Sequence, residues 1–214
     1  MKMGVISNIY FCLLLLITAI GAYRFLLFEK SARLFYVLIA TGLVNEILVR
    51  IFQYRQVNTM ILYHFYCPLD FILICLFFLY SIKIRRRIPY NIAIFIVISL
   101  LGYLNYKYLQ PVNHIASNMF TLESFSAIIM ALFALYKILV DERIDLLYKY
   151  ANFWFWAFSL ILYGGTFFFW AYIIVIAKDD HLIEIAQNIQ GLINIFVFIG
   201  IGFVFLFYPK MAKK

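Results

Sequence analysis

The chain has 214 residues, of which 66% are hydrophobic and only 13% are charged, and its mean hydropathy is +0.96. A soluble domain is nearer to half apolar and a quarter charged, and a chain of this length has too little interior to bury so much apolar surface. The composition therefore excludes a soluble fold. The net charge of +8 would suggest nucleic-acid binding in a soluble protein, but in a membrane protein it reflects basic loops, so we expect no nucleic-acid partner.

Seven segments are long and apolar enough to cross a lipid bilayer as helices. Such a helix needs about 20 mostly apolar residues. The stretches between the segments carry Lys, Arg, Pro or Asn, as turns do; examples are KIRRRIPYN at 83–91 and QPVNH at 110–114. The sequence thus predicts an all-α, polytopic membrane protein with one seven-transmembrane-helix bundle over residues 1–214. The expected helices cover roughly residues 5–27, 33–54, 59–82, 90–109, 116–139, 151–177 and 184–208.

The basic residues predict the direction of these helices. Cytoplasmic loops are enriched in Lys and Arg, and one set of connections holds 13 of the 18 basic residues. This places the N-terminus outside and the C-terminus in the cytoplasm, and it favours a first segment that is retained over a cleaved signal peptide. We expect Lys83, Arg85, Arg86 and Arg87 to contact anionic lipid headgroups. The 13 residues are Arg24, Lys30, Arg33, Lys83, Arg85, Arg86, Arg87, Lys137, Arg143, Lys149, Lys210, Lys213 and Lys214.

Strongly polar side chains occur inside four of the predicted helices. The predicted direction puts them in the outer half of the membrane, with Asp70 near the middle. Such groups are unfavourable toward lipid and usually face the bundle interior or a water-filled cavity. We therefore expect one polar cavity that opens to the outside. In chain order the residues are Asn45, Glu46, His64, Asp70, Ser117, Thr121, Glu123, Ser124, Gln187, Gln190 and Asn194.

Helical spacing groups several polar residues on shared faces. Gln187, Gln190 and Asn194 lie at i, i+3 and i+7 of the last helix, and Tyr66 and Asp70 lie at i and i+4 of the third. Residues at these spacings share one side of a helix. The predicted ligand- or ion-binding residues are Asp70, Glu46, Asn45, Glu123, Tyr66, Gln187, Gln190, Asn194 and His64.

Asp70 has two interpretations. An acid near the middle of a membrane is a functional-site hypothesis by default, so we favour binding of a ligand, an ion or a proton. In the alternative, Asp70 is protonated or hydrogen-bonded to a neighbour and stabilises helix packing. His64 lies about 120° from Asp70 around the helix, and for it a packing role is favoured. Glu46 and Arg50 can pair along their own helix. This leaves open whether Arg50 simply neutralises Glu46 or whether Glu46 also binds a ligand.

The sequence lacks the motifs of several known chemistries. Residues 184–208 contain no lysine, which excludes a retinal Schiff base, and no HExxH, GxSxG or P-loop motif occurs. Cys12, Cys67 and Cys75 have neither CxxC spacing nor a His at metal-site spacing, so we expect no metal site and no cofactor. We expect no enzymatic activity; a membrane hydrolase that uses Asp70 and Glu46 is the alternative.

Four stretches form a distinctive combination: LVNEIL at 43–48, VNTMILYHFYCPLDFILICLFF at 57–78, FWFWAFSLILYGGTFFFW at 153–170 and GFVFLFYPK at 202–210. The combination resembles a group of small, uncharacterised seven-helix membrane proteins common in Bacteroidetes. The resemblance implies a protein of the bacterial inner membrane, draws attention to Asn45, Glu46 and Asn58, and carries no established activity. Many members look to have Glu at the third-helix acid position, where this chain has Asp70.

Three functional hypotheses follow from the sequence. The favoured one is a ligand-binding, sensor-like protein that acts through a separate cytoplasmic or membrane partner, because its cytoplasmic loops are very short. The second is a transporter of a small solute, an ion or protons, with Asp70 and Glu123 as coupling carboxylates. The third is an accessory membrane protein of a signalling or defence system with no ligand. The inner halves of the helices are mainly Leu, Ile and Phe, which weighs against an open pore.

Overall fold

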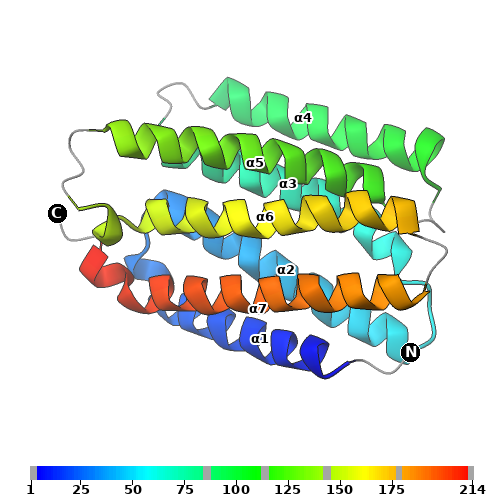
Figure 1. The fold of residues 1–214 in the computed structure, drawn as a ribbon. Coiled ribbons are helices and arrows are strands. Elements are labelled where there is room, and N and C mark those ends of the chain that lie inside the picture. The colour runs from blue at the N-terminus through cyan, green and yellow to red at the C-terminus, as the bar shows by residue number, and fades with distance from the viewer. Residues whose placement is uncertain (1–3, 84–87, 112–115, 142–145, 177–179, 212–214) are drawn as a thin grey trace.

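The chain forms a bundle of long helices (Figure 1), which we describe from a computed structural model covering residues 4–83, 88–111, 116–141, 146–176 and 180–211. Within these ranges seven helical segments are long and apolar enough to cross a membrane, and there is no β-strand. This confirms the predicted all-α, seven-helix membrane fold. The elements are α1 Val5–Arg24, η1 Phe25–Leu27, α2 Lys30–Tyr54, α3 Met60–Ser81, α4 Ile88–Leu104, η2 Asn105–Leu109, α5 Ser117–Val140, η3 Leu147–Lys149, α6 Ala151–Ile176 and α7 Asp180–Met211.

The observed helix ends differ from the predicted ones mainly where the flanking residues are polar. α2 begins at Lys30 rather than near residue 33, and α7 extends past residues 184–208 at both ends. Hydropathy marks only the part of a helix that crosses the hydrocarbon. Helical hydrogen bonding continues beyond it, because long polar side chains there can reach water. The fourth segment ends in the π-helical turn η2.

Six helices form a closed ring, and α4 lies outside it. Contacts between neighbours run in the order α1, α2, α3, α5, α6, α7 and back to α1, and α2 also contacts α6. α4 packs mainly on α3, at the edge of the bundle (Figure 1). Gly102 permits this close approach, because a Cβ there would lie 2.8 Å from Cγ of Pro68. The six ring helices can therefore share one central space that α4 does not reach.

The outer surface of the bundle is apolar. Phe65 is 73% exposed, Phe168 is 72% exposed and Phe196 is 62% exposed. A soluble monomer rarely exposes contiguous apolar surface on this scale, whereas hydrocarbon tails solvate it well. Backbone polar groups of the helices are satisfied internally, as a lipid environment requires. The surface agrees with the membrane location that the helix lengths indicate.

An aromatic cluster fills the ring in one half of the bundle. Its five members are each at most 2% exposed. The ring centroids of Phe35 and Phe155 are 4.5 Å apart, and those of Phe77 and Trp156 are also 4.5 Å apart. The cluster closes the centre of the ring on the side away from the N-terminal end of α1. Its members come from α2, α3, α6 and α7 and are Phe35, Phe77, Phe155, Trp156 and Phe205.

Candidate functional site

A cavity of about 280 Å³ occupies the other half of the ring. Most of its lining residues come from the N-terminal halves of α1, α3, α5 and α7 and from the C-terminal halves of α2 and α6, which all lie toward the same end of the bundle, and the others lie near the middle of their helices. All six ring helices contribute to the lining, and no described residue of α4 does. The lining residues are Tyr10, Leu38, Ile39, Gly42, Asn45, Glu46, Tyr63, Tyr66, Asp70, Phe120, Glu123, Ser124, Leu162, Tyr163, Thr166, Phe169, Trp170, Gln190, Asn194 and Phe198.

The structure brings most of the predicted binding residues together in this cavity. They come from α2, α3, α5 and α7, which are far apart in the sequence. Clustering of the intramembrane polar groups at one end of the bundle was expected from their positions along the predicted helices. The predicted residues that line the cavity are Asn45, Glu46, Tyr66, Asp70, Glu123, Gln190 and Asn194.

Two predicted residues lie elsewhere. Gln187 is exposed on α7 although Gln190 and Asn194 line the cavity. The three residues lie within about 60° of one another around the helix, so Gln187 differs from Gln190 and Asn194 mainly in lying nearer the N-terminal end of α7, beyond the cavity. His64 faces α4 and the following turn η2, where its ring centroid is 6.0 Å from that of Tyr106. Neither Gln187 nor His64 can therefore contact a solute held in the cavity.

Of the predicted headgroup contacts, only Lys83 lies among the described residues. Arg85, Arg86 and Arg87 lie outside the described residues. Lys83 follows the end of α3 and is exposed. It lines a cleft together with Lys30 and other residues at the start of α2. A cleft lined by basic side chains at a helix end suits an anionic lipid headgroup.

Asp70 and Glu123 form a carboxyl pair in the cavity wall. Their side chains lie close to each other, and they are only 6% and 2% exposed. Asp70 accepts hydrogen bonds from the Tyr66 hydroxyl at Oδ1 (3.2 Å) and from the Tyr163 hydroxyl at Oδ2 (2.9 Å). The Cys67 thiol donates to Oε2 of Glu123 at 2.9 Å. Because two neighbouring carboxyl groups in a site with little water strongly disfavour ionisation of both, the pair is suited to share a proton.

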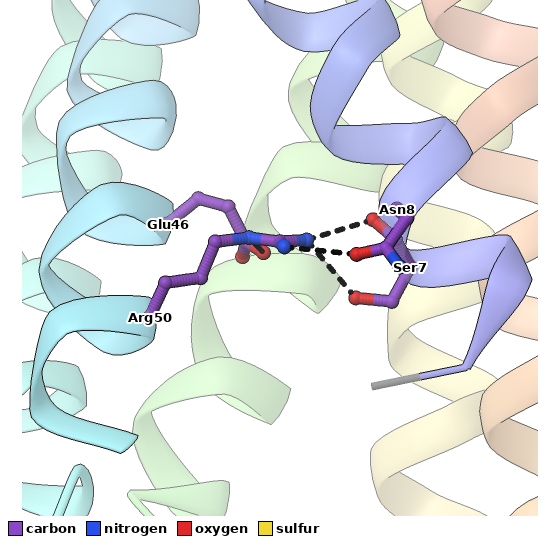
Figure 2. A network of polar contacts seen from close by, with 4 residues as sticks. All are labelled: Ser7, Asn8, Glu46 and Arg50. Atoms are coloured by element: carbon purple, nitrogen blue, oxygen red, sulfur yellow. Dashed lines mark hydrogen bonds and ion pairs between the residues drawn. The ribbon is translucent and has the colours of Figure 1, made fainter. Parts of the chain in front are cut away.

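Arg50 joins α1 to α2 beside the cavity (Figure 2). Its Nε donates to Oε1 of Glu46 at 3.0 Å, so the pairing predicted from the sequence is present. The rest of the guanidinium reaches α1, where it donates to Oδ1 of Asn8 (3.0 Å) and to the carbonyl oxygen (2.9 Å) and Oγ (3.2 Å) of Ser7. The guanidinium carbon also lies 4.1 Å from the ring centroid of Phe11. Arg50 thus neutralises Glu46 and positions the N-terminal end of α1.

Side-chain amides connect α6 and α7 across the cavity wall. Nε2 of Gln190 donates to Oγ1 of Thr166 and to Oδ1 of Asn194, both at 3.1 Å. Gly165 makes room for this contact, because a Cβ there would lie 3.2 Å from Oε1 of Gln190. The amide pair therefore presents a fixed arrangement of donors and acceptors at the α6–α7 side of the cavity.

One polar group of the cavity wall is left without a partner. Ser124 is 1% exposed and lines the cavity next to Glu123. Its Oγ forms no hydrogen bond to any described protein atom. An unsatisfied buried hydroxyl is unfavourable by about 1–3 kcal/mol. Ser124 therefore indicates a place where a bound solute or water would supply the missing hydrogen bond.

Several cavity residues were not among the sequence-based candidates. Tyr163 makes the shortest hydrogen bond to Asp70, and Trp170 stacks on Phe120 with their ring centroids 4.9 Å apart. Tyr10 completes the wall from α1. In a membrane helix such aromatic residues are usually interfacial or lipid-facing. Only the packing of the ring distinguishes the ones that face inward.

No known protein supplies a function by similarity. The chain matches no protein-family model, no curated protein and no solved structure. Within the described residues, no group of three or more His, Cys, Asp or Glu side chains could hold a metal ion. The chemistry available in the cavity is that of a proton-holding carboxyl pair, amides, hydroxyls and aromatic rings.

Proposed function

We propose that this protein is a membrane-embedded receptor that binds a small solute in the cavity and passes the binding event to a separate partner. The observation that carries the proposal is the cavity of about 280 Å³ in which polar side chains of α2, α3, α5, α6 and α7 meet. Intramembrane polar groups of this kind are energetically unfavourable in contact with lipid and usually serve a function.

The proposed binding face is the outer face of the bacterial inner membrane. The supporting argument is the excess of basic residues at the opposite end of the bundle, which includes Lys30, Arg33 and Lys83. In this topology the cavity receives solutes from outside. The cytoplasmic connections are too short to form an output domain, so a separate membrane or cytoplasmic protein transmits the signal.

A receptor is favoured over a channel because of the aromatic cluster beneath the cavity. Phe77, Phe155 and Trp156 are fully buried and fill the ring in its other half. Ligand binding can change the packing between α6 and its neighbours, since Tyr163 and Trp156 belong to the same helix. Such a shift of packed helices is a common way to transmit a binding event.

Binding can be tested by screening small polar solutes against the purified protein in nanodiscs, with thermal stabilisation as the readout. A genuine cavity ligand should lose its effect in Gln190→Ala and Asp70→Asn. It should keep its effect in Gln187→Ala, a matched control that removes an amide from the same helix outside the cavity. Solutes that stabilise all of these variants equally, or an absence of any stabilising solute, would contradict the proposal and favour an accessory protein without a ligand.

Topology is tested separately with single-cysteine variants in a Cys-free background. Asn58 and Asp141 lie in connections at opposite ends of the bundle. The proposal expects a membrane-impermeant maleimide to label Asn58→Cys in intact cells and Asp141→Cys only after lysis. The reverse pattern would refute the proposed direction.

A proton-coupled transporter is the second candidate, and the carboxyl pair favours it. Asp70 and Glu123 are two buried carboxyl groups in the cavity wall, and intramembrane carboxyl groups often act as proton relays in transporters. In proteoliposomes a transporter would show solute uptake that depends on a pH gradient and is lost in Glu123→Gln. A receptor would bind the same solute without accumulating it.

A further inference from the structure

We infer that the solute bound in the cavity is a small organic cation with a protonated amine. The inference rests on the proposed function and adds the chemical class of the ligand. Three independent features of the cavity wall support it: its charge, its aromatic surface and its unsatisfied hydrogen-bonding capacity.

The charge of the cavity wall favours a cation. None of its lining residues is Lys, Arg or His, and three of them are Asp or Glu. Arg50 neutralises Glu46 from outside the lining, through the 3.0 Å contact. The carboxyl pair of Asp70 and Glu123 has no basic partner among the lining residues, so with one shared proton it carries one negative charge. A second anion next to this pair would be strongly disfavoured in a site with little water.

The aromatic surface of the cavity points in the same direction. Eight of the lining residues are aromatic, and they come from α1, α3, α5, α6 and α7. The faces of aromatic rings attract organic ammonium groups, most strongly where water is excluded. A wall of aromatic rings with one carboxylate charge is the usual composition of an amine-binding pocket. The eight residues are Tyr10, Tyr63, Tyr66, Phe120, Tyr163, Phe169, Trp170 and Phe198.

The hydrogen-bonding groups of the wall distinguish a protonated amine from a neutral solute. A primary ammonium group has three donors and no acceptor. The Ser124 hydroxyl is buried without a partner beside Glu123, and each carboxyl oxygen can accept more than one hydrogen bond. An ammonium group near Glu123 can therefore donate to Ser124 and to the carboxyl pair together.

Ammonium binding competes with the uptake of a second proton by the carboxyl pair, because both would neutralise the same remaining negative charge. Binding should therefore release protons and weaken as the pH falls. The other titratable or charged groups facing the pair lie on α1, α2, α3 and α6. They are Tyr10, Glu46, Arg50, Tyr63, Tyr66, Cys67 and Tyr163.

Equilibrium binding to the protein in zwitterionic nanodiscs tests the inference, using three probes of similar size: butylammonium, butyramide and butyrate. Trp170 lines the cavity, so its fluorescence reports occupancy. We expect butylammonium to bind at least about tenfold more tightly than the amide or the acid, as a charge-assisted hydrogen bond would provide. Asp70→Asn should weaken butylammonium by about tenfold or more, and Ser124→Ala by less.

The variants separate the possible outcomes. Gln187→Ala is the control and should bind butylammonium like the wild type. If Asp70→Asn does not yield a monodisperse protein, Glu123→Gln and Ser124→Ala provide the same test. Butyramide or butyrate binding as tightly as butylammonium would refute the cation inference while leaving solute binding intact. If no probe changes the fluorescence, the solute-binding proposal fails, and the cation inference fails with it.

Discussion

The hydrogen bonds from Arg50 of α2 to Ser7 and Asn8 of α1 allow a quantitative test of the fold around the cavity. We consider Arg50→Lys, which keeps the positive charge beside Glu46 but removes the planar fork of donors. The three hydrogen bonds from Arg50 to Ser7 and Asn8 are the polar contacts at risk, together with the stacking on Phe11.

The expected destabilisation follows from these contacts. The side chain of Arg50 is 17% exposed, so water replaces part of each lost interaction. We therefore assign about 1 kcal/mol to each hydrogen bond, the middle of the range for neutral partners. A lysine ammonium can restore one of the three, which leaves a net loss of about 2 kcal/mol in the free energy of unfolding. For a chain of this size that corresponds to about 4–8 °C in melting temperature.

Both a global and a local measurement are needed. Thermal unfolding in nanodiscs gives the change in stability, and hydrogen exchange of residues 5–12 reports the attachment of α1. The exposed Arg55, which follows α2, provides the matched control Arg55→Lys, and we expect no change there. Unchanged stability and unchanged exchange of residues 5–12 in Arg50→Lys would show that apolar packing alone holds α1, and the reasoning would be refuted.

Three further predictions follow from the packing and the cavity. Ser81→Ala should lower the free energy of unfolding by about 1–3 kcal/mol, because the buried indole of Trp156 donates to Ser81 Oγ at 2.9 Å. Ser159→Ala removes a buried hydroxyl without a partner among described atoms, so it should not lower the free energy of unfolding, and equal losses for the two variants in unfolding assays would contradict this. Gly102→Ala should weaken the packing of α4 on α3, which would be measured as faster hydrogen exchange in residues 88–104. Gly164→Ala, where the new Cβ would meet open space, should leave that exchange unchanged. Slow exchange of residues 88–104 in both variants would argue against the close contact between α4 and α3. Butylammonium affinity measured between pH 8 and pH 5 should fall, by up to about tenfold per pH unit where the carboxyl pair takes up its second proton, and an affinity independent of pH would argue against binding at that pair.

Much of the architecture could be predicted from the sequence alone. A membrane-spanning segment must satisfy its backbone hydrogen bonds internally, so an apolar run of sufficient length has to be a helix. This is why all seven helices could be predicted with ends correct to within a few residues. The depth of each polar side chain in the membrane can also be predicted from the sequence, because it depends only on the position of the residue along its own helix. The gathering of Glu46, Asp70, Glu123 and Gln190 at one end of the bundle follows from that.

The tertiary structure decided which side each residue faces. Apolar residues surround these helices on all sides, so amphipathic periodicity carries little information about the buried face. Tyr163 therefore looked like one more aromatic residue of α6 in the sequence. The closed ring, with α4 outside it, directs His64 toward α4 and Tyr163 toward Asp70. Sequence alone determined how deep each side chain lies in the membrane, while helix packing determined whether it meets lipid, a neighbouring helix or the cavity.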